Sequence, residues 1–232
     1  QEGAGVVFDQ ANEAFTARYT HETIALAFAI TEEAIEDNLY DRLASRYTRA
    51  LARSMSNTKQ VKAAAVLNNA QVTTVLGGDG VPLISNAHPL SNGGTFSNVL
   101  ATAADLNETS LEQSLIDIQG FVDERGLKIA LSGRKMIIPK ELQFTAERLM
   151  KSPLRTGTAD NDINAINNMG MIPEGYRINN FLTDTDSFFI LTDVPNGFKH
   201  FERSPIKTAL EGDFDTGNVR FKARERYSFG FS

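Results

Sequence analysis

Large apolar residues alternate with alanines between Thr23 and Ile30, and this period of two predicts a β-strand. The stretch just before it, from Arg18 to Glu22, is polar. A strand that is apolar at one end and polar at the other suits a hairpin that projects from the core of its own chain. We expect the partner strand around Gly3–Phe8, with a turn near Asp9–Asn12.

The period changes at Thr31, where a long amphipathic helix is predicted to begin. Thr31 can cap the helix, and acidic residues in the first turns favour the positive end of the helix dipole. Apolar residues then recur every four positions and form one stripe: Ile35, Leu39, Leu43, Tyr47, Leu51 and Met55. Neither Gly nor Pro occurs between Thr31 and Leu76, so the helix can continue to Asn69, a length of about 55–60 Å. Such a helix indicates a structural strut.

Two further helices and several strands are predicted in the rest of the chain. The second helix begins at Thr109 or Ser110, with a capping box from Ser110 to Gln113, and ends at Gly126. Pro139 takes the first position of the third helix, which contains Leu149. Strand-like runs lie at 128–131, 135–138, 176–178, 187–194 and 219–231. The order of these elements predicts an α+β fold.

The composition agrees with a globular protein of one or two domains: 232 residues, 41% hydrophobic and 22% charged. The longest apolar run, Ile24–Ile30, is far shorter than the roughly 20 residues of a membrane span, so no membrane partner is expected. The absence of Cys excludes disulfides and thiol catalysis. A net charge of −6 is unusual for a nucleic-acid binder. Because the chain starts without Met and ends directly after a strand-like run, we expect it to be part of a longer protein.

Two rows of cations stand out as candidate contact surfaces. One follows the long helix at positions i, i+4, i+7 and i+11: Arg42, Arg46, Arg49 and Arg53. The other occupies one face of the last strand, whose opposite face is apolar except for Glu225: Arg220, Lys222, Arg224 and Arg226. A half-buried strand with a solvated face explains the second row, and an alternative is that it binds carboxylates or phosphates. Because the chain is acidic, a neighbouring copy is the favoured partner.

No set of residues forms a catalytic or metal-binding constellation. The three histidines stand far apart and lack a second ligand at metal spacing: His21, His88 and His200. The run Gly77–Gly80 lacks the Lys-Ser/Thr of a phosphate loop. Two carboxylate pairs fit turns: Asp184 with Asp186, and Asp213 with Asp215. We therefore predict a non-enzymatic protein without a cofactor or metal. Opposite charges on separate elements are typical of a protein that assembles with copies of itself.

Seven segments carry a resemblance that runs in order over nearly the whole chain: Phe8–Asp9, Thr16–His21, Ala25–Asp37, Asp79–His88, Ile137–Pro139, Gly157–Asn164 and Arg224–Gly230. They resemble the major capsid proteins of tailed bacteriophages of the Hong Kong 97 type, close to the branch of the Mu-like major head subunit. The resemblance implies an extended loop at 1–31 and a peripheral domain with a long spine helix at 32–105. It further implies an axial domain at 106–210 and a final strand at 211–232 that returns to the peripheral domain.

The resemblance also implies the function. Copies of the subunit would assemble as hexamers and pentamers, in the cytoplasm of a bacterial host, into an icosahedral phage head. The head would enclose double-stranded DNA without sequence-specific binding, and portal, scaffolding and decoration proteins are further partners that the family offers. The same fold builds encapsulin-type compartments, which remain an alternative. A soluble hydrolase that uses His88 or the Asp pairs is another alternative.

Specific contacts are expected from this resemblance. The hairpin Thr16–Ile30 would lie over an adjacent subunit, with Arg18 and Glu22 among its polar contacts. The acidic start of the spine helix, or its Arg42–Arg53 row, would face a neighbour of opposite charge. The type member of the family crosslinks its subunits through a lysine of the extended loop, whereas the first lysine in this sequence is Lys59. We therefore predict no such isopeptide crosslink.

Overall fold

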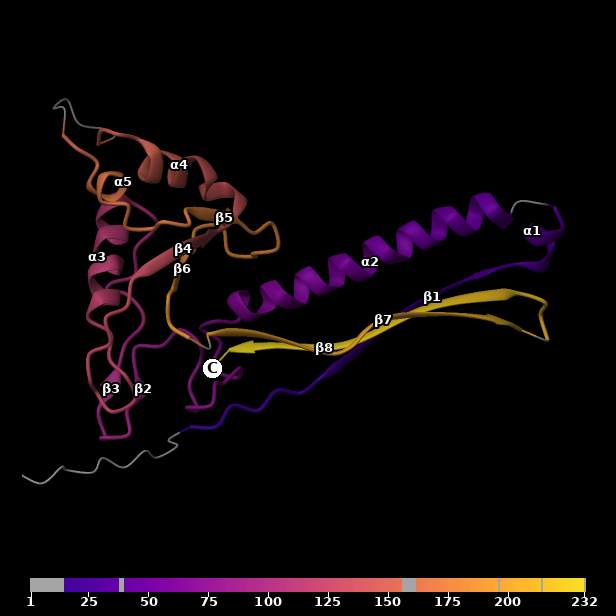
Figure 1. Cartoon of the computed structure of the whole chain (residues 1–232), viewed down its shortest axis with the longest axis horizontal. Helices are drawn as coiled ribbons and strands as arrows, with labels where there is room; N and C mark the ends of the chain where they lie inside the picture. Colours follow the sequence, from indigo (N-terminus) through magenta and orange to yellow (C-terminus); the bar gives the residue numbers. More distant parts are fainter. Residues whose placement is uncertain (1–14, 38–39, 156–161, 196, 214, 232) are drawn as a thin grey trace, which may run out of the picture.

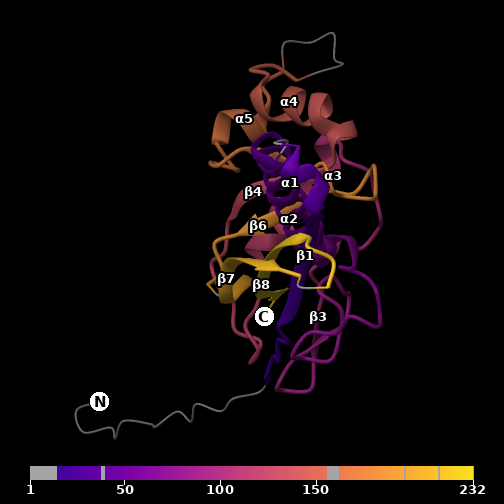
Figure 2. The same ribbon diagram turned by 90° about the vertical axis from the view of Figure 1, so that its right-hand side faces the viewer.

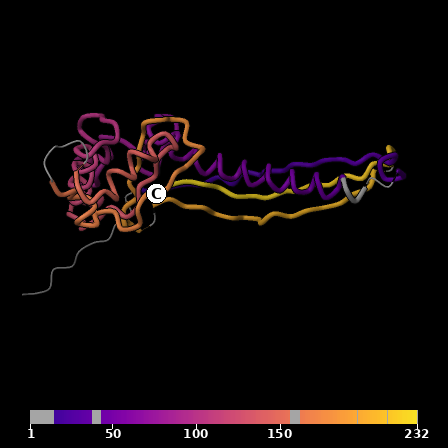
Figure 3. The backbone as a smooth tube through the Cα atoms, turned by 90° about the horizontal axis from the view of Figure 1, so that it is seen from above, coloured from indigo at the N-terminus to yellow at the C-terminus, as the bar shows by residue number. Residues whose placement is uncertain are grey.

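The structure is a computed structural model that describes residues 15–37, 40–155, 162–195, 197–213 and 215–231, and only the backbone of residues 40–42. A long, thin arm extends from a lobe in which the remaining helices and strands gather (Figure 1). Seen from above, the arm stays narrow along its whole length (Figure 3). The protein is therefore elongated and has two unequal parts.

The arm consists of one helix on one sheet. Helix α2 (Tyr40–Asn68) lies along a three-stranded antiparallel sheet with the order β1-β8-β7. The strands are β1 (Glu22–Ile30), β7 (Phe198–Gly212) and β8 (Val219–Phe231). A short helix, α1 (Glu32–Glu36), lies at the far tip of the arm beside the turn that joins β7 to β8.

The pairing of β1 with β8 determines which residues face α2. Ile24 is opposite Glu225, Leu26 is opposite Ala223, and Phe28 is opposite Phe221. The rings of Phe28 and Phe221 stack with their centroids 4.8 Å apart. The buried residues of the arm's core cluster, Leu51 and Met55 of α2 and Ala223 of β8, pack against Ile24 and Phe28. The alternation of both strands is thus confirmed, and the apolar stripe is confirmed at Leu51 and Met55. Of its other predicted members, Ile35 belongs to α1, Tyr47 is 41% exposed, and Leu39 lies outside the described residues.

The arm differs from the sequence prediction in three places. Asp37 forms the C-cap of α1, so the long helix begins at Tyr40 rather than at Thr31 and ends at Asn68, close to the predicted Asn69. The described partner of β1 is β8, and the partner expected at Gly3–Phe8 lies outside the described residues. Strand β7 was not predicted, because an exposed edge strand with bulges and a proline shows no alternation.

The lobe contains the larger core. A sheet with the order β5-β4-β6 is built from β4 (Gly133–Ile138), β5 (Tyr176–Ile178) and β6 (Phe189–Thr192). Helices α3 (Glu108–Gln119), α4 (Gln143–Lys151) and α5 (Ala165–Met169) accompany it, with a 3₁₀ turn, η1, at Lys140–Leu142. The short strands β2 (His88–Pro89) and β3 (Thr95–Phe96) pair with each other. Figure 2 views the arm end-on, with these lobe elements behind it.

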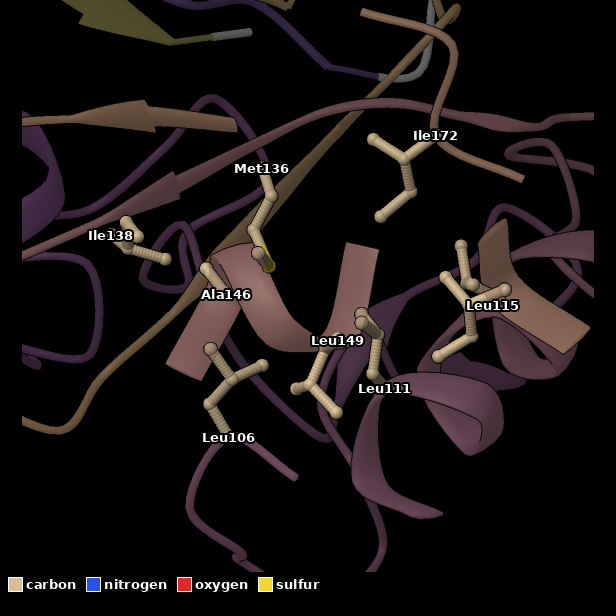
Figure 4. Packing of buried hydrophobic residues seen from close by; sticks show 9 residues of the cluster. Leu106, Leu111, Leu115, Met136, Ile138, Ala146, Leu149 and Ile172 are labelled. Carbon is tan, nitrogen blue, oxygen red and sulfur yellow. The ribbon is translucent and has the colours of Figure 1, made fainter. Parts of the chain in front are cut away.

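Residues from α3, β4 and α4 pack into one cluster, which Figure 4 shows from close by. Leu111, Met136, Ile138 and Ala146 are fully inaccessible to solvent. Gly133 lies where an added Cβ would come within 2.9 Å of Leu115, so β4 approaches α3 as closely as a glycine allows. The lobe therefore has a closed hydrophobic core of its own.

Helix boundaries in the lobe were predicted only in part. Helix α3 begins one residue before Thr109, because the capping box is formed by Asn107 with Ser110 and not by Ser110 with Gln113. The helix ends at Gln119 with Gly120 as its C-cap, whereas Gly126 adopts a positive φ of 83° in a later turn. Pro139 is the N-cap of η1, just outside the helix. Of the predicted strand at 128–131, only an isolated bridge at Lys128 is present. The α+β class is confirmed.

The end of α2 connects the arm to the lobe. The side-chain amide of Asn68 donates a hydrogen bond of 3.0 Å to the carbonyl of Phe181, and its oxygen accepts one of 3.1 Å from the amide of Thr183. Both partners belong to the loop between β5 and β6. This joint therefore fixes the last turn of the arm helix to the lobe.

Candidate inter-subunit surfaces

The first candidate surface is the row of arginines on α2. Arg46, Arg49 and Arg53 are exposed, on the side of the helix away from the sheet. Arg49 donates a hydrogen bond of 2.9 Å to the hydroxyl of Ser45, one turn earlier. The side chain of Arg42 lies outside the described residues. The row is thus a solvated basic stripe.

The second candidate surface is the outer face of the arm sheet, opposite α2. Arg220, Lys222 and Arg224 are exposed there, and Arg226 is half-buried. Arg220 pairs with Asp213, a residue of the turn between β7 and β8. The basic face predicted for the last strand is confirmed.

The inner face of the same strand contains one charge, Glu225, and it is buried. Lys59 of α2 approaches it, with the ammonium nitrogen 3.8 Å from a carboxylate oxygen of Glu225 and 3.7 Å from one of Glu202. The same ammonium lies 5.0 Å from the ring centre of Tyr227. Lys59 was not predicted from the sequence. The signal that could have found it is the isolated carboxylate of Glu225 on an apolar face, because a buried charge requires a partner.

The third candidate surface is the segment from Phe15 to His21, which follows the sheet to the base of the arm. The hydroxyl of Tyr19 donates a hydrogen bond of 2.7 Å to the carbonyl of Phe231. An added Cβ at Gly230 would collide with the Tyr19 ring, and one at Gly78 would lie 2.9 Å from the amide nitrogen of Ala17. The segment is thus seated closely on two glycines.

Arg18 and Glu22, the residues expected to contact an adjacent subunit, differ in their surroundings. Arg18 is exposed. The carboxylate of Glu22 forms an ion pair with Lys62 of α2 within the same chain. Arg18 is thus the more accessible of the two for a neighbouring subunit.

The fourth candidate surface is the acidic tip of the arm. The carboxylates of Glu33, Glu36 and Asp37 are exposed, and no ion pair joins them to any side chain that the structure describes. The hydroxyl of Thr31 accepts a hydrogen bond of 3.4 Å from the amide of Ala34, so Thr31 is the N-cap, as predicted. Glu32 lies against Gly217, whose φ of 65° suits glycine.

The residues considered for catalysis serve as local structural contacts. His88 pairs with Asp79 at 2.6 Å and packs near Phe96, which fixes the loop between α2 and α3. His21 approaches the hydroxyl of Ser228 at 3.2 Å, and His200 stacks on Phe229. His21 and His200 thus contact adjacent residues of β8, whereas His88 lies in a different loop. No group of three or more His, Asp or Glu able to hold a metal occurs among the described residues.

The two carboxylate pairs also stabilise turns. A hydrogen bond between Asp184 and Asp186 lowers the pKa of Asp184 and raises that of Asp186. The pKa of Asp213 is lowered by a hydrogen bond from Thr216 and by the charge of Arg220.

In the described part of the chain, no helix is both long and apolar enough to cross a membrane.

A long helix laid on a narrow sheet, joined to a separate α+β lobe, is also the architecture of solved phage capsid proteins. A bacteriophage JBD30 capsid protein superposes with a TM-score of 0.55 at 11% identity, covering 76% of this chain and 83% of that one. The capsid protein of an empty GTA particle gives a TM-score of 0.51 at 17% identity, covering 99% of this chain and 77% of that one. A Mycobacterium phage Che8 protein gives a TM-score of 0.48 at 16% identity. The match covers 90% of this chain, which spans 66% of the length of that protein. The first two likenesses show a fold of the Hong Kong 97 type.

The family follows from the sequence match. A family model described as "Phage capsid protein" matches residues 14–231, so the chain belongs to the phage capsid protein family. As a member of this family it is a structural protein of the virion head shell rather than an enzyme. No curated protein matches the chain.

Proposed function

We propose that copies of this protein assemble as hexamers and pentamers into an icosahedral head that encloses double-stranded DNA. The observation that carries the proposal is the arm: one helix covers one face of its sheet, and the opposite face presents exposed cations. An arm so thin buries few of its own residues, and a shell would cover its open faces with neighbouring copies. The capsid of the empty GTA particle, computed with C5 symmetry, offers a precedent for pentamers.

Within the family, the seven segments that resemble tailed-phage capsid proteins favour the branch of the Mu-like major head subunit. The division into an extended loop, a peripheral domain and an axial domain is part of the same proposal. The arm would then be the core of the peripheral domain, and the lobe would supply the axial domain. Strand β7 pairs with β8, so the return to the peripheral domain would begin at Phe198.

The enclosed DNA would be held without sequence-specific contacts. A net charge of −6 suits a wall that does not grip the genome, because strong phosphate binding requires many cations in one place. Portal, scaffolding and decoration proteins would be additional partners, as the family resemblance implies. The assembly would form in the cytoplasm of a bacterial host.

Negative-stain microscopy of the purified full chain, combined with nuclease treatment and extraction of nucleic acid, tests the proposal. We expect uniform angular shells and, in particles from infected cells, nuclease-protected double-stranded DNA. A monomer in solution would contradict shell assembly. Shells that contain an enzyme cargo and no DNA would instead support an encapsulin-type compartment.

The arginine row on α2 is proposed as one of the contact surfaces. Reversing the charge of Arg46 and Arg49 should impair assembly more than folding, because both side chains are exposed. Shell yield and the melting temperature of the unassembled chain measure the two effects. Equal loss of both would count against a contact at this row.

Covalent crosslinking is not part of the proposed assembly. The segment that resembles the extended loop contains no lysine, since the first lysine is Lys59. Mature particles should therefore run as single subunits on a denaturing gel. A ladder of covalent multimers would refute this prediction.

A further inference from the structure

The outer face of the arm sheet carries more cations than carboxylates, even with Glu211 opposite Arg220. Four of its cations form no ion pair with any side chain that the structure describes: Lys207, Lys222, Arg224 and Arg226. We call these four residues the basic sheet face. Arg220, at the tip end of the same row, is paired with Asp213 and is not part of it.

The strand register concentrates these charges. Lys207 is directly opposite Arg224 in the pairing of β7 with β8. Like charges in opposite positions destabilise a sheet. The half-buried Arg226 adds to the imbalance, because its Nε is shielded from solvent and has no hydrogen-bond partner among the described residues. Carboxylates placed over this face would relieve the repulsion and satisfy the unpaired donor.

The neighbours of the cations leave room for a partner. Lys222 stands between Ala27 of β1 and Ala209 of β7, and Ala25 is opposite Arg224. Ala25, Ala27 and Ala209 are exposed. Small side chains therefore flank the long cations on both sides, and a protein segment can approach the charges closely.

The arm also contains the complementary surface. Glu33 and Glu36 lie three residues apart in α1, on one side of the helix, and Asp37 follows. These three exposed carboxylates form the acidic tip. From the tip end of β8, the cations at 222–226 lie about 10–25 Å along the strand at roughly 3.4 Å per residue. That is beyond the screening length of about 8 Å at physiological salt, so the tip does not neutralise the face of its own chain.

We propose that the basic sheet face of one copy binds the acidic tip of a second copy. The proposal rests on the proposed shell assembly and names the partner of one of its surfaces. The contact joins two different patches, so it is heterologous and builds a ring around an axis if its rotation closes. The paired groups are guanidinium or ammonium and carboxylate, whose hydrogen bonds are short and directional.

A charge swap in the full chain tests the pairing. The double variant K222E/R224E and the double variant E33K/E36K should each lower shell yield about tenfold or more, because like charges then face each other. The quadruple variant that combines them should restore the yield to within about twofold, since the same pairing then forms with reversed signs. The conservative variant K222R/R224K, which keeps the charges, is the matched control and should assemble normally.

Folding is monitored separately by the circular dichroism and melting temperature of the unassembled chains. Failure of the quadruple variant to recover, while its melting temperature matches that of the wild type, would overturn the proposal. Normal shells from K222E/R224E that retain less DNA would also overturn it and would assign the face to nucleic acid. If the wild type forms oligomers but no closed shells, the shell proposal fails. The charge-swap variants are then compared by the amount of oligomer that each forms, measured by sedimentation.

A second measurement addresses the contact directly. Carbodiimide treatment of particles assembled from a mixture of ¹⁴N and ¹⁵N chains should join the Lys222 amine to the carboxylate of Glu33 or Glu36 as an amide, with loss of water to the reagent. Crosslinked peptides with one light and one heavy half are expected, because the two residues belong to different copies. Crosslinks confined to a single isotope would contradict the proposal.

Discussion

The lobe and the arm of this capsid protein bury their apolar residues in different ways. Nine buried residues of the lobe form one cluster enclosed by helices and a sheet. The corresponding cluster of the arm has three, Leu51, Met55 and Ala223, although α2 and β7 are the longest elements of the described chain. The lobe thus has the core of an independent domain, whereas the arm is a single layer of helix on a single sheet. In the proposed assembly, neighbouring copies would supply the contacts that the arm lacks.

The largest single effect is expected in the lobe core. Met136 is fully buried, and Met136→Ala should lower the free energy of unfolding by about 2–5 kcal/mol through lost contacts and a cavity. Urea denaturation of the unassembled chain measures this loss. For comparison, Leu26→Ala in the arm removes a side chain that is 42% exposed and should cost clearly less. Equal losses would break the contrast between the two regions.

A smaller effect is expected at the one buried charge of the arm. Lys59→Met leaves Glu225 without its cation and should cost about 1–3 kcal/mol, because a buried carboxylate then lacks a partner. The double variant Lys59→Met with Glu225→Leu is the control and should recover much of the loss, since it removes both charges. Thermal unfolding of the three proteins gives the comparison. A double variant that is less stable than Lys59→Met would contradict the prediction, because the unpaired carboxylate would then carry no cost.

The segment from Phe15 to His21 provides a test at the base of the arm. Gly230→Ala should displace Tyr19 and lose its hydrogen bond to Phe231, at a cost of about 0.5–1.5 kcal/mol. Limited proteolysis should then cleave this segment faster, with the lobe unaffected. Gly212→Ala is the matched control, because an added Cβ there meets no atom within 4 Å. Equal cleavage in both variants would mean that the segment is not held by Tyr19.

The smallest effect concerns the acid stability of the lobe. The amide and hydroxyl of Ser132 donate hydrogen bonds of 2.9 and 3.0 Å to Asp193, and the amide bond is the main cause that lowers the pKa of this carboxyl. A lowered folded pKa contributes stability above the unfolded value near about 4, and this contribution is lost as the pH falls through the folded pKa. Asp193→Asn should therefore make stability less dependent on pH below about 4. Urea denaturation at several pH values measures the free energy of unfolding. The same fall in this free energy below about pH 4 in Asp193→Asn and in the wild type would contradict the prediction.

The sequence predicted those parts of the fold whose signal is local. The apolar stripe from Leu43 to Met55 and the alternation of β8 each result from one element packing on one side, so periodicity reveals them. The pairing of β1 with β8 joins residues about two hundred positions apart and has no local signal. Strand β7 was missed because it is an exposed edge strand in which Pro205 and two register shifts interrupt the pattern.

The candidate surfaces follow the same division. The cations of β8 were predicted to share one face, and they do, because strand geometry alone places alternate residues together. Their environment was not predictable: Lys207 and Ala209 come from β7, and Ala25 and Ala27 come from β1. Likewise, the Lys59–Glu225 pair depends on how α2 lies on the sheet.

Hydrogen–deuterium exchange on the unassembled chain and on assembled shells tests most directly whether the arm is completed by its neighbours. We predict that the lobe core, including β4 and α3, is protected to a similar degree in both states. The edge strands β1 and β7 and the tip helix α1 should exchange quickly in the free chain and slowly in the shell. An arm already as protected as the lobe in the free chain, or one that gains no protection on assembly, would contradict this.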